Sequence, residues 1–356
     1  MFGISDKALQ WVQSYLESRV YQVQIDGYYS EMCSLDYGIP QGSVLGPLAF
    51  ILYTSPIGNI IRKHGLRFHK YADDDQIYIT FDPRTPGACQ AALHSLQTCI
   101  AEVNVSMTMN KLKLNPNKTE FFICGTAQNI SKLPPDVVLT LEGNVFKPST
   151  SVRNLGIIFD SHMSMTPHIN SLISSLNFHL RNIRRISRFL DFDTKHMVVR
   201  SLILSRMDNG NALLYGAKVK DLDRLQSVQN KAVKLIFSAD RRASPSPLLD
   251  SLHWLPVRER IQFKLCMYVY KCLHGCAPNY LSAFISYKSH PETGPVTRSA
   301  DDTSLLTVHV GRTRTGDRSF SVSAPMLWNC LPKEIREACS LPVFKKLLKS
   351  HLYPVY

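Results

Sequence analysis

The pattern of apolar residues changes at Asp160, and this change limits the available folds more than any other feature of the chain. Before Asp160, short β-type runs alternate with helical ones, and residues 68–80 place β-rich residues on both sides of an acidic turn. After Asp160, apolar residues recur with helical spacing until about residue 285. We therefore expect an α+β fold, with antiparallel strands and helices first and helices afterwards.

The expected elements follow from where the apolar runs start and stop. Before Asp160 they are a hairpin ending near Leu35, a helix over 44–61 that Pro56 interrupts, a helix over 88–110 and one short strand over 153–160. After Asp160 they are helices over 172–190, 221–237 and 342–352, with a polar, turn-rich segment over 286–318. The sequence therefore predicts three regions along the chain: residues 1–160 with strands and helices, residues 161–285 with helices, and residues 286–356, which start with the polar segment.

The positive charge of the chain is concentrated in its middle. The 356 residues carry a formal net charge of +13. Residues 1–125 hold 10 basic and 11 acidic side chains, whereas residues 126–290 hold 22 basic and 11 acidic ones. Because a basic surface attracts polyanions, we expect the middle of the chain to face nucleic acid.

The sequence predicts an intracellular protein of the nucleus or cytoplasm, neither secreted nor membrane-bound. No segment approaches the roughly 18 apolar residues of a membrane-spanning helix, and the first ten residues lack the regions of a signal peptide. The nine cysteines form no CxxC pair, which is typical of a reducing compartment. We interpret Cys272-x-His274-x-Cys276 as a helix end that turns at Gly275 rather than as a zinc site.

Three consecutive carboxylates, those of Asp73, Asp74 and Asp75, stand between two apolar-rich strands. Like charges at this spacing repel each other unless a cation compensates them. Carboxylate oxygens suit Mg²⁺, which keeps several waters and shares its shell with substrate phosphates. Two such ions activate a 3′-hydroxyl and stabilise a leaving pyrophosphate. Taken alone, the same three residues also fit a solvated surface turn without metal.

The surroundings of the acidic turn favour the metal-binding interpretation. The relevant segments are YGIPQGSVLGPLAFILY (37–53), YADDDQIYI (71–79), NKLKLNPNKTEFFI (110–123) and NLGIIFD (154–160). In this order and spacing they resemble motifs B, C, D and E of a reverse transcriptase of the LINE, or non-LTR retrotransposon, type. The resemblance continues through SLHWLPVRERIQFKLCMYVYKCLHGCAPNYL (251–281) and FSVSAPMLWNCLP (320–332), so it covers essentially the whole chain.

The resemblance implies roles for individual residues. Asp73 would be the motif C metal ligand and Asp74 its neighbour on the catalytic turn, in a box that Tyr71 and Ala72 complete. Lys118 matches the motif D lysine, a proton donor to the leaving pyrophosphate; a solvated turn lysine is the alternative. The motif B residues, at the template and incoming-nucleotide pocket, are Gly38, Pro40, Gln41, Gly42 and Ser43. The residues that match the motif E grip on the primer strand are Leu155 and Gly156.

The sequence departs from the family pattern in two places. Asp75 stands where threonine is usual, and it either adds charge to the site or faces solvent. The aspartates ahead of the turn are Asp6, Asp26 and Asp36, and none lies in an apolar strand like the one that carries the motif A aspartate of the family. Since two-metal polymerisation needs carboxylates from two strands, the resemblance implies an N-terminally truncated RNA-directed DNA polymerase that is inactive alone, with an incomplete palm followed by a helical thumb.

The implied cofactor is Mg²⁺, and the implied partners are an RNA template, an RNA/DNA duplex and, in an active enzyme, deoxynucleoside triphosphates. A non-catalytic nucleic-acid-binding protein that uses the basic helices is the first alternative. An unfolded or short-lived product of a decayed element is the second.

Helix 172–190 carries the clearest physical signal for nucleic acid. At about 100° per residue its leucine and isoleucine side chains gather on one side, and four arginines fall within about 100° of arc on the other: Arg181, Arg184, Arg185 and Arg188. Phosphates are natural partners for such a stripe, and a solvated face is the alternative. Helix 221–237 shows a weaker basic face, which we interpret as solvated. The aromatic residues expected in the interior are Trp11, Trp254, Phe263, Tyr268, Tyr270 and Trp328.

Overall fold

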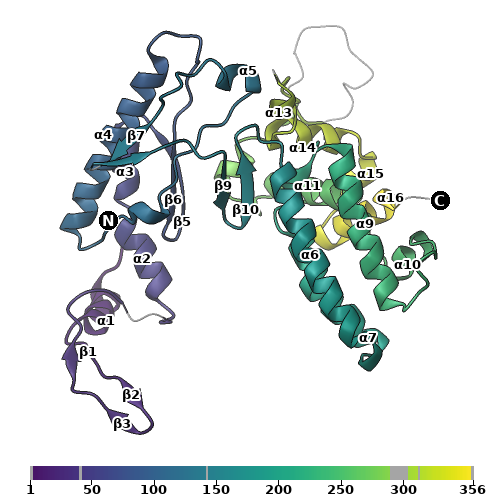
Figure 1. The fold of residues 1–356 in the computed structure, drawn as a ribbon, viewed down its shortest axis with the longest axis horizontal. Helices are drawn as coiled ribbons and strands as arrows, with labels where there is room; N and C mark the ends of the chain where they lie inside the picture. The colour runs from purple at the N-terminus through teal and green to yellow at the C-terminus, as the bar shows by residue number, and fades with distance from the viewer. Residues whose placement is uncertain (1–2, 40–41, 142, 289–303, 312, 354–356) are drawn as a thin grey trace. The chain divides into compact units, whose positions relative to one another are not determined.

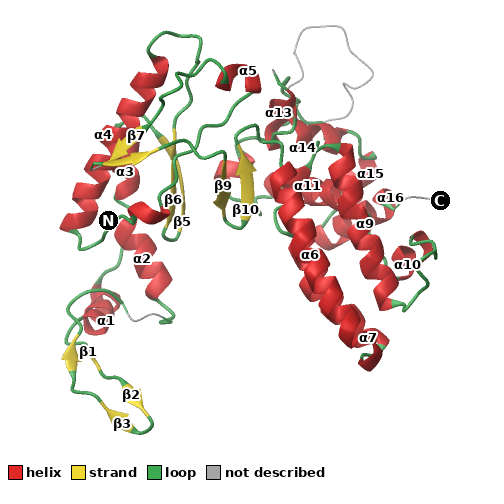
Figure 2. Cartoon of the chain, viewed as in Figure 1, coloured by secondary structure: helices red, strands yellow, loops and turns green. Residues whose placement is uncertain are grey.

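The computed structural model describes residues 3–39, 42–141, 143–288, 304–311 and 313–353. The chain divides into two compact units. Unit 1 comprises Met1–Phe121 and Thr126–Pro148, and unit 2 comprises Phe122–Gly125 and Ser149–Tyr356. Helices and antiparallel hairpins occur together in unit 1, whereas unit 2 is largely helical (Figure 1, Figure 2). The expected α+β class is confirmed.

The strands of unit 1 form antiparallel hairpins. The pairs are β1 (Val20–Tyr21) with β4 (Cys33–Ser34), β2 (Gln24–Ile25) with β3 (Tyr28–Tyr29), β5 (Arg67–Tyr71) with β6 (Asp74–Tyr78), and β7 (Leu139–Leu141) with β8 (Asn144–Phe146). Among the described residues no ladder joins more than two strands. The expected hairpins over 20–35 and 68–80 are therefore present, and in the described residues their strands do not pair with those of a larger sheet.

The helices of unit 1 break at proline as expected. They are α1 (Asp6–Leu16), α2 (Gly46–Thr54), α3 (Ile57–Lys63), α4 (Ala88–Met109) and α5 (Ala127–Ile130), with a 3-10 turn η1 (Pro116–Lys118). Pro56 separates α2 from α3 because it has no backbone N–H to donate within a helix. Pro47 lies in the first turn of α2, where the missing donor costs nothing.

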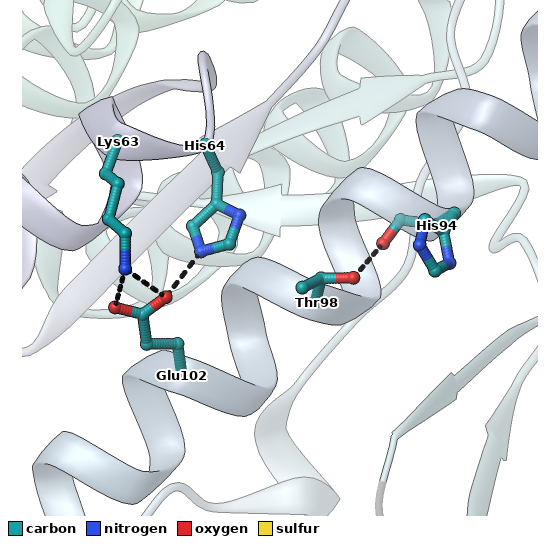
Figure 3. Close-up of polar contacts among 5 residues, drawn as sticks. All are labelled: Lys63, His64, His94, Thr98 and Glu102. Carbon is teal, nitrogen blue, oxygen red and sulfur yellow. Dashed lines mark hydrogen bonds and ion pairs between the residues drawn. The ribbon is translucent and has the colours of Figure 1, made fainter.

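The core of unit 1 forms where α3 and α4 pack beside the β5–β6 hairpin. Its residues include Ile57, Ile61, Cys99 and Val103, with Phe68 and Ile77 of the hairpin packed against them. Glu102 of α4 ties the two helices together: its carboxylate accepts a hydrogen bond from Lys63 Nζ at 2.9 Å and contacts His64 Nε2 at 2.8 Å (Figure 3). These contacts join α4 to the end of α3, and Phe68 and Ile77 attach the hairpin to the same core.

Residues 151–160 form a hairpin, so the single short strand expected over 153–160 is wrong. β9 (Ser151–Asn154) pairs with β10 (Ile157–Asp160), and Leu155 and Gly156 make the two-residue turn. Both turn residues have positive φ, 46° and 84°, which is the requirement of a type I′ turn. Because leucine seldom adopts such a φ, the turn at Leu155 was difficult to predict from the residue types.

The rest of unit 2 is built from helices. They are α6 (Thr166–Ile186), α7 (Phe192–Val199), α8 (Ser205–Asp208), α9 (Val219–Ile236), α10 (Ser246–Ser251), α11 (Val257–Leu273), α12 (Asn279–Ser282), α13 (Arg314–Asp317), α14 (Phe320–Asn329), α15 (Lys333–Arg336) and α16 (Leu341–Leu352). Two 3-10 helices, η2 (Ser187–Phe189) and η4 (Asn211–Leu214), and a π-helix, η3 (Arg200–Leu204), stand between them. Gly275, at φ +65°, follows the end of α11, which confirms the expected helix end there.

The helix expected over 172–190 ends at Ile186, which corrects part of the predicted apolar side. Leu172, Leu176, Leu180 and Ile183 are buried as expected, but Ile186, the last residue of α6, is 49% exposed. The four buried residues join α9 and α11 in one core cluster. No helix in the described part of the chain combines the length and the apolarity needed to cross a bilayer.

The aromatic residues divide between core and surface. Trp254 and Trp328 are buried as expected, and Trp328 of α14 packs against Phe344 of α16 in the second core cluster of unit 2. Trp11 was expected in the interior and is instead 54% exposed, stacked on Tyr15 with 5.8 Å between ring centroids. The expectation was wrong because helical periodicity alone does not supply a surface to cover the apolar side, and α1 buries none of its residues.

Candidate active site and nucleic-acid interface

The acidic turn is the tip of the β5–β6 hairpin. Tyr71 pairs with Asp74 as the last rung of the ladder, so Ala72 and Asp73 form a two-residue turn. Ala72 has φ +55°, a conformation that two-residue turns usually give to glycine. The carboxylates of Asp73 and Asp74 belong to exposed residues next to each other at this tip.

Asp75 does not add free charge to the tip. Its partner across the ladder is Lys70, and the ammonium of Lys70 lies 2.7 Å from the Asp75 carboxylate. Successive residues of a strand point to opposite faces, so Asp75 shares a face with Phe68 and Ile77, which pack against the core of unit 1. Asp75 is exposed, as one of the two sequence expectations held, and its ion pair with Lys70 means that it does not add uncompensated charge to the site.

The other face of the hairpin is polar and aromatic. His69 and Tyr78 stack there with 5.5 Å between ring centroids, and the Tyr78 hydroxyl lies 3.2 Å from His69 Nε2. Tyr71, on this face beside Asp74, is 64% exposed. The predicted residues Tyr71, Ala72, Asp73 and Asp74 are thus brought together at one accessible end.

Two adjacent carboxylates suit one side of a Mg²⁺ shell, because this ion commonly takes one or two protein carboxylates and completes its shell with waters and substrate phosphates. Within the described residues, no group of three or more His, Cys, Asp or Glu side chains gathers as metal ligands. Asp6, Asp26 and Asp36, the aspartates that precede the turn, are all exposed. The hairpin therefore offers a pair of uncompensated carboxylates at its tip, because the neighbouring Asp75 is paired with Lys70.

The segment over 37–43 is anchored to the start of the chain. Tyr15 donates its hydroxyl hydrogen to Ser43 Oγ at 2.8 Å, and Arg19 Nη1 donates to the Gly38 carbonyl at 2.5 Å. Gly38 and Gly42 have φ of +80° and +89°, and a Cβ on either would meet no atom within 4 Å. Their glycine requirement therefore comes from backbone conformation in this chain. Pro40 and Gln41 lie outside the described residues.

Lys118 lies in η1, which follows an Asx-type turn. The Asn115 side chain accepts a hydrogen bond from the backbone N–H of Asn117 at 3.1 Å. Lys118 is exposed and takes part in no ion pair within the described chain. Its ammonium is therefore available to an external anion.

Leu155 and Gly156 form the turn of the β9–β10 hairpin in unit 2. The far end of β10 is fixed by Asp160, a residue whose structural part the sequence did not reveal. Burial raises the pKa of Asp160, but hydrogen bonds from the backbone N–H groups of Ser164 and Met165 outweigh it and leave the pKa below its ordinary value. The hairpin is thereby joined to the start of α6.

The arginine stripe of α6 separates into two sets. Arg181 and Arg184 line a groove between α6 and α9, together with Lys231, Lys234 and other residues of α9. Arg185 is exposed outside that groove, and Arg188 lies in η2 with its guanidinium 4.6 Å from the Phe189 ring centroid. That Lys231 and Lys234 line the same groove as the α6 arginines could not be predicted from the sequence, because helical periodicity describes one helix at a time.

Residues 1–159 match the family model described as reverse transcriptase (RNA-dependent DNA polymerase). This range contains the acidic turn and the 37–43 segment. The reverse transcriptase resemblance drawn from the motifs is therefore confirmed over this range.

Curated relatives extend the resemblance beyond the matched range. The chain is 25% identical over 258 residues to the probable RNA-directed DNA polymerase from transposon BS of Drosophila melanogaster, covering 70% of this chain and 28% of the relative. It is 23% identical over 246 residues to the RNA-directed DNA polymerase from mobile element jockey of Drosophila funebris, covering 66% and 26%.

A third relative is the probable RNA-directed DNA polymerase from transposon X-element of Drosophila melanogaster, 25% identical over 238 residues, which cover 64% of this chain and 25% of the relative. The chain thus spans about a quarter of the length of the curated relatives it matches. No solved structure matches it.

Proposed function

We propose that this chain is part of the reverse transcriptase of a LINE-type, non-LTR mobile element and that the β5–β6 hairpin supplies carboxylates to its active site. The observation that carries the proposal is the register of the hairpin, which presents Asp73 and Asp74 at an exposed tip while Lys70 neutralises Asp75. The family match of residues 1–159 and the relatives named RNA-directed DNA polymerase support it.

In this proposal Asp73 and Asp74 would hold Mg²⁺, which would supply activation of the 3′-hydroxyl and charge neutralisation at the leaving pyrophosphate. The hairpin contributes position, because a two-residue turn at the end of a five-rung ladder allows the two side chains little freedom. Tyr71 and Ala72 flank the tip, where the base pair being formed would lie.

The 37–43 segment would receive the template base and the incoming deoxynucleoside triphosphate. Positive φ at Gly38 and Gly42, with no Cβ, leaves the backbone open to a nucleotide. The contacts of Tyr15 and Arg19 hold this segment in place. Lys118 would give its proton to the leaving pyrophosphate, and Leu155 and Gly156 would contact the primer strand at the β9–β10 turn.

We also propose that these 356 residues do not polymerise alone. Asp6 starts α1, Asp26 lies in the β2–β3 turn at φ 46°, and Asp36 is an exposed residue ahead of the 37–43 segment. Two-metal transfer needs a further carboxylate facing the tip. A primer-extension assay on an RNA template with Mg²⁺ or Mn²⁺ should give no product; extension that Asp73→Ala abolishes would contradict this part.

A graft tests the catalytic assignment of the hairpin itself. Residues 67–78 replace the aligned hairpin in the jockey RNA-directed DNA polymerase, and primer extension is measured. The graft should retain extension, Asp73→Asn in the graft should abolish it, and Asp75→Asn should leave most of it. A folded graft that retains extension with Asp73→Asn would contradict the assignment.

A further inference from the structure

A groove of about 1120 Å³ lies between α6 and α9 in unit 2. The two helices pack side by side (Figure 1), and residues 238–241, which follow α9, also line the space. Residues of α6, of α9 and of the 238–241 segment all line the groove. The groove therefore depends on the packing of unit 2 and involves no residue of unit 1.

Five basic side chains line this groove: Arg181, Arg184, Lys231, Lys234 and Arg241. No acidic side chain lines it in the described structure, and none of the five forms an ion pair there. Lys234 Nζ donates to the Arg241 carbonyl at 2.8 Å, which leaves its charge uncompensated. Five like charges facing one space repel each other unless an anion enters.

Arg224, a basic residue of α9 outside the groove, is paired with an acidic side chain. Its guanidinium lies 3.2 Å from the Asp221 carboxylate and donates to Asn170 Oδ1 at 2.7 Å. This arginine belongs to the same helix and does not line the groove. The lack of acidic partners is thus a property of the groove rather than of α9 as a whole.

The other lining residues indicate which part of a polyanion would enter. They are mostly hydroxyl and amide side chains, including Ser174, Asn177, Ser227 and Asn230, with no aromatic ring among the described lining residues. Bases are usually held by aromatic stacking, whereas hydroxyls, amides and cations bind phosphate and sugar oxygens. The surface furrow along two packed helices is about as wide as the 8–10 Å spacing of their axes, which suits one backbone strand and is narrower than a whole duplex.

We propose that the α6–α9 groove binds the phosphodiester backbone of one nucleic-acid strand, without base recognition. The strand is either single-stranded RNA or one strand of an RNA/DNA duplex laid along the groove. This site needs neither metal nor nucleotide and holds whether or not the chain polymerises. It assigns backbone contacts to Arg181 and Arg184 and places Arg185 and Arg188 outside the contact.

The experiment measures binding of the full chain by fluorescence anisotropy, without metal or nucleotide, to a labelled single-stranded RNA and to a labelled RNA/DNA duplex across a salt series. The test variant is Arg184→Gln/Lys231→Gln, one cation from each helix. Losing two phosphate contacts should weaken single-strand binding about tenfold at physiological salt and lower the slope of log affinity against log salt by about 1.4. Comparing the affinities of the two probes shows whether the strand in the groove is single-stranded RNA or one strand of an RNA/DNA duplex.

Three further variants make the result specific. Arg184→Lys/Lys231→Arg keeps the charges and should keep affinity. Lys345→Gln/Lys346→Gln removes two exposed charges of α16, outside the groove, and should leave affinity within about twofold because the net charge change alone acts weakly. Arg185→Gln/Arg188→Gln should behave like the α16 variant. Equal losses for the groove and Arg185/Arg188 variants, or no binding of either probe by the unmodified chain, would overturn the proposal.

Discussion

At the scale of single residues, Ala72 combines a left-handed backbone with a Cβ. An alanine at φ +55° carries about 1–2 kcal/mol of steric strain, and glycine would relieve it while costing about 0.5–1 kcal/mol in chain entropy. Ala72→Gly should therefore raise the free energy of unfolding of unit 1 by up to about 1 kcal/mol, as measured by urea denaturation. Ala92→Gly, in the buried face of α4, is the matched control and should lose about 1 kcal/mol. A comparable loss at Ala72 would contradict the strained turn.

Glu102 gives a pH dependence at the same scale. Hydrogen bonds from Lys63 and then His64 hold the pKa of Glu102 below its ordinary 4.5. A lowered folded pKa adds stability that is present above the ordinary value and lost as pH falls through the folded value. The denaturation midpoint, measured from pH 6 downward, should therefore decrease once the pH is lower than about 4.5. Glu102→Gln should flatten the midpoint-against-pH curve in that range. An unchanged curve in Glu102→Gln would contradict the contact between α3 and α4.

At the scale of elements, Arg318 joins the segment before α14 to two distant parts of unit 2. Its guanidinium donates to the backbone carbonyls of Tyr215 at 2.9 Å and Met163 at 3.1 Å. Arg318→Ala leaves these carbonyls without their charged donor and should lower the free energy of unfolding by about 2–3 kcal/mol. Arg314→Ala, at an exposed position four residues earlier, should change it by less than about 0.5 kcal/mol. Thermal denaturation of the two variants measures the difference, and equal losses would contradict the role of Arg318.

The elements also show what sequence patterns can predict. Helix positions, the break at Pro56 and the hairpin that carries the acidic turn were predictable, because proline chemistry and apolar periodicity act locally. The Leu155–Gly156 turn and the end of α6 at Ile186 were not, since leucine rarely takes positive φ and isoleucine fits a helix. The exposure of Trp11 and the Lys70–Asp75 pair depend on which surfaces meet, and that is a property of tertiary packing.

At the scale of the whole molecule, the structure shows where part of the net charge of +13 lies. The sequence assigned the excess to the middle of the chain and the arginine stripe to one helix. The structure divides that stripe and adds Lys231, Lys234 and Arg241 to Arg181 and Arg184. The motif residues of the candidate active site were identifiable from sequence, whereas the groove arises only when α6 and α9 pack together.

We have proposed that the β5–β6 tip is a divalent-metal site of a reverse transcriptase. The most direct test of this proposal is electron paramagnetic resonance of Mn²⁺ titrated into the full chain with a deoxynucleoside triphosphate present, since substrate phosphates complete the metal shell. We predict protein-bound Mn²⁺ in the unmodified chain and in Asp75→Asn, and its loss in Asp73→Asn/Asp74→Asn. Mn²⁺ binding that is unchanged in Asp73→Asn/Asp74→Asn would contradict the claim.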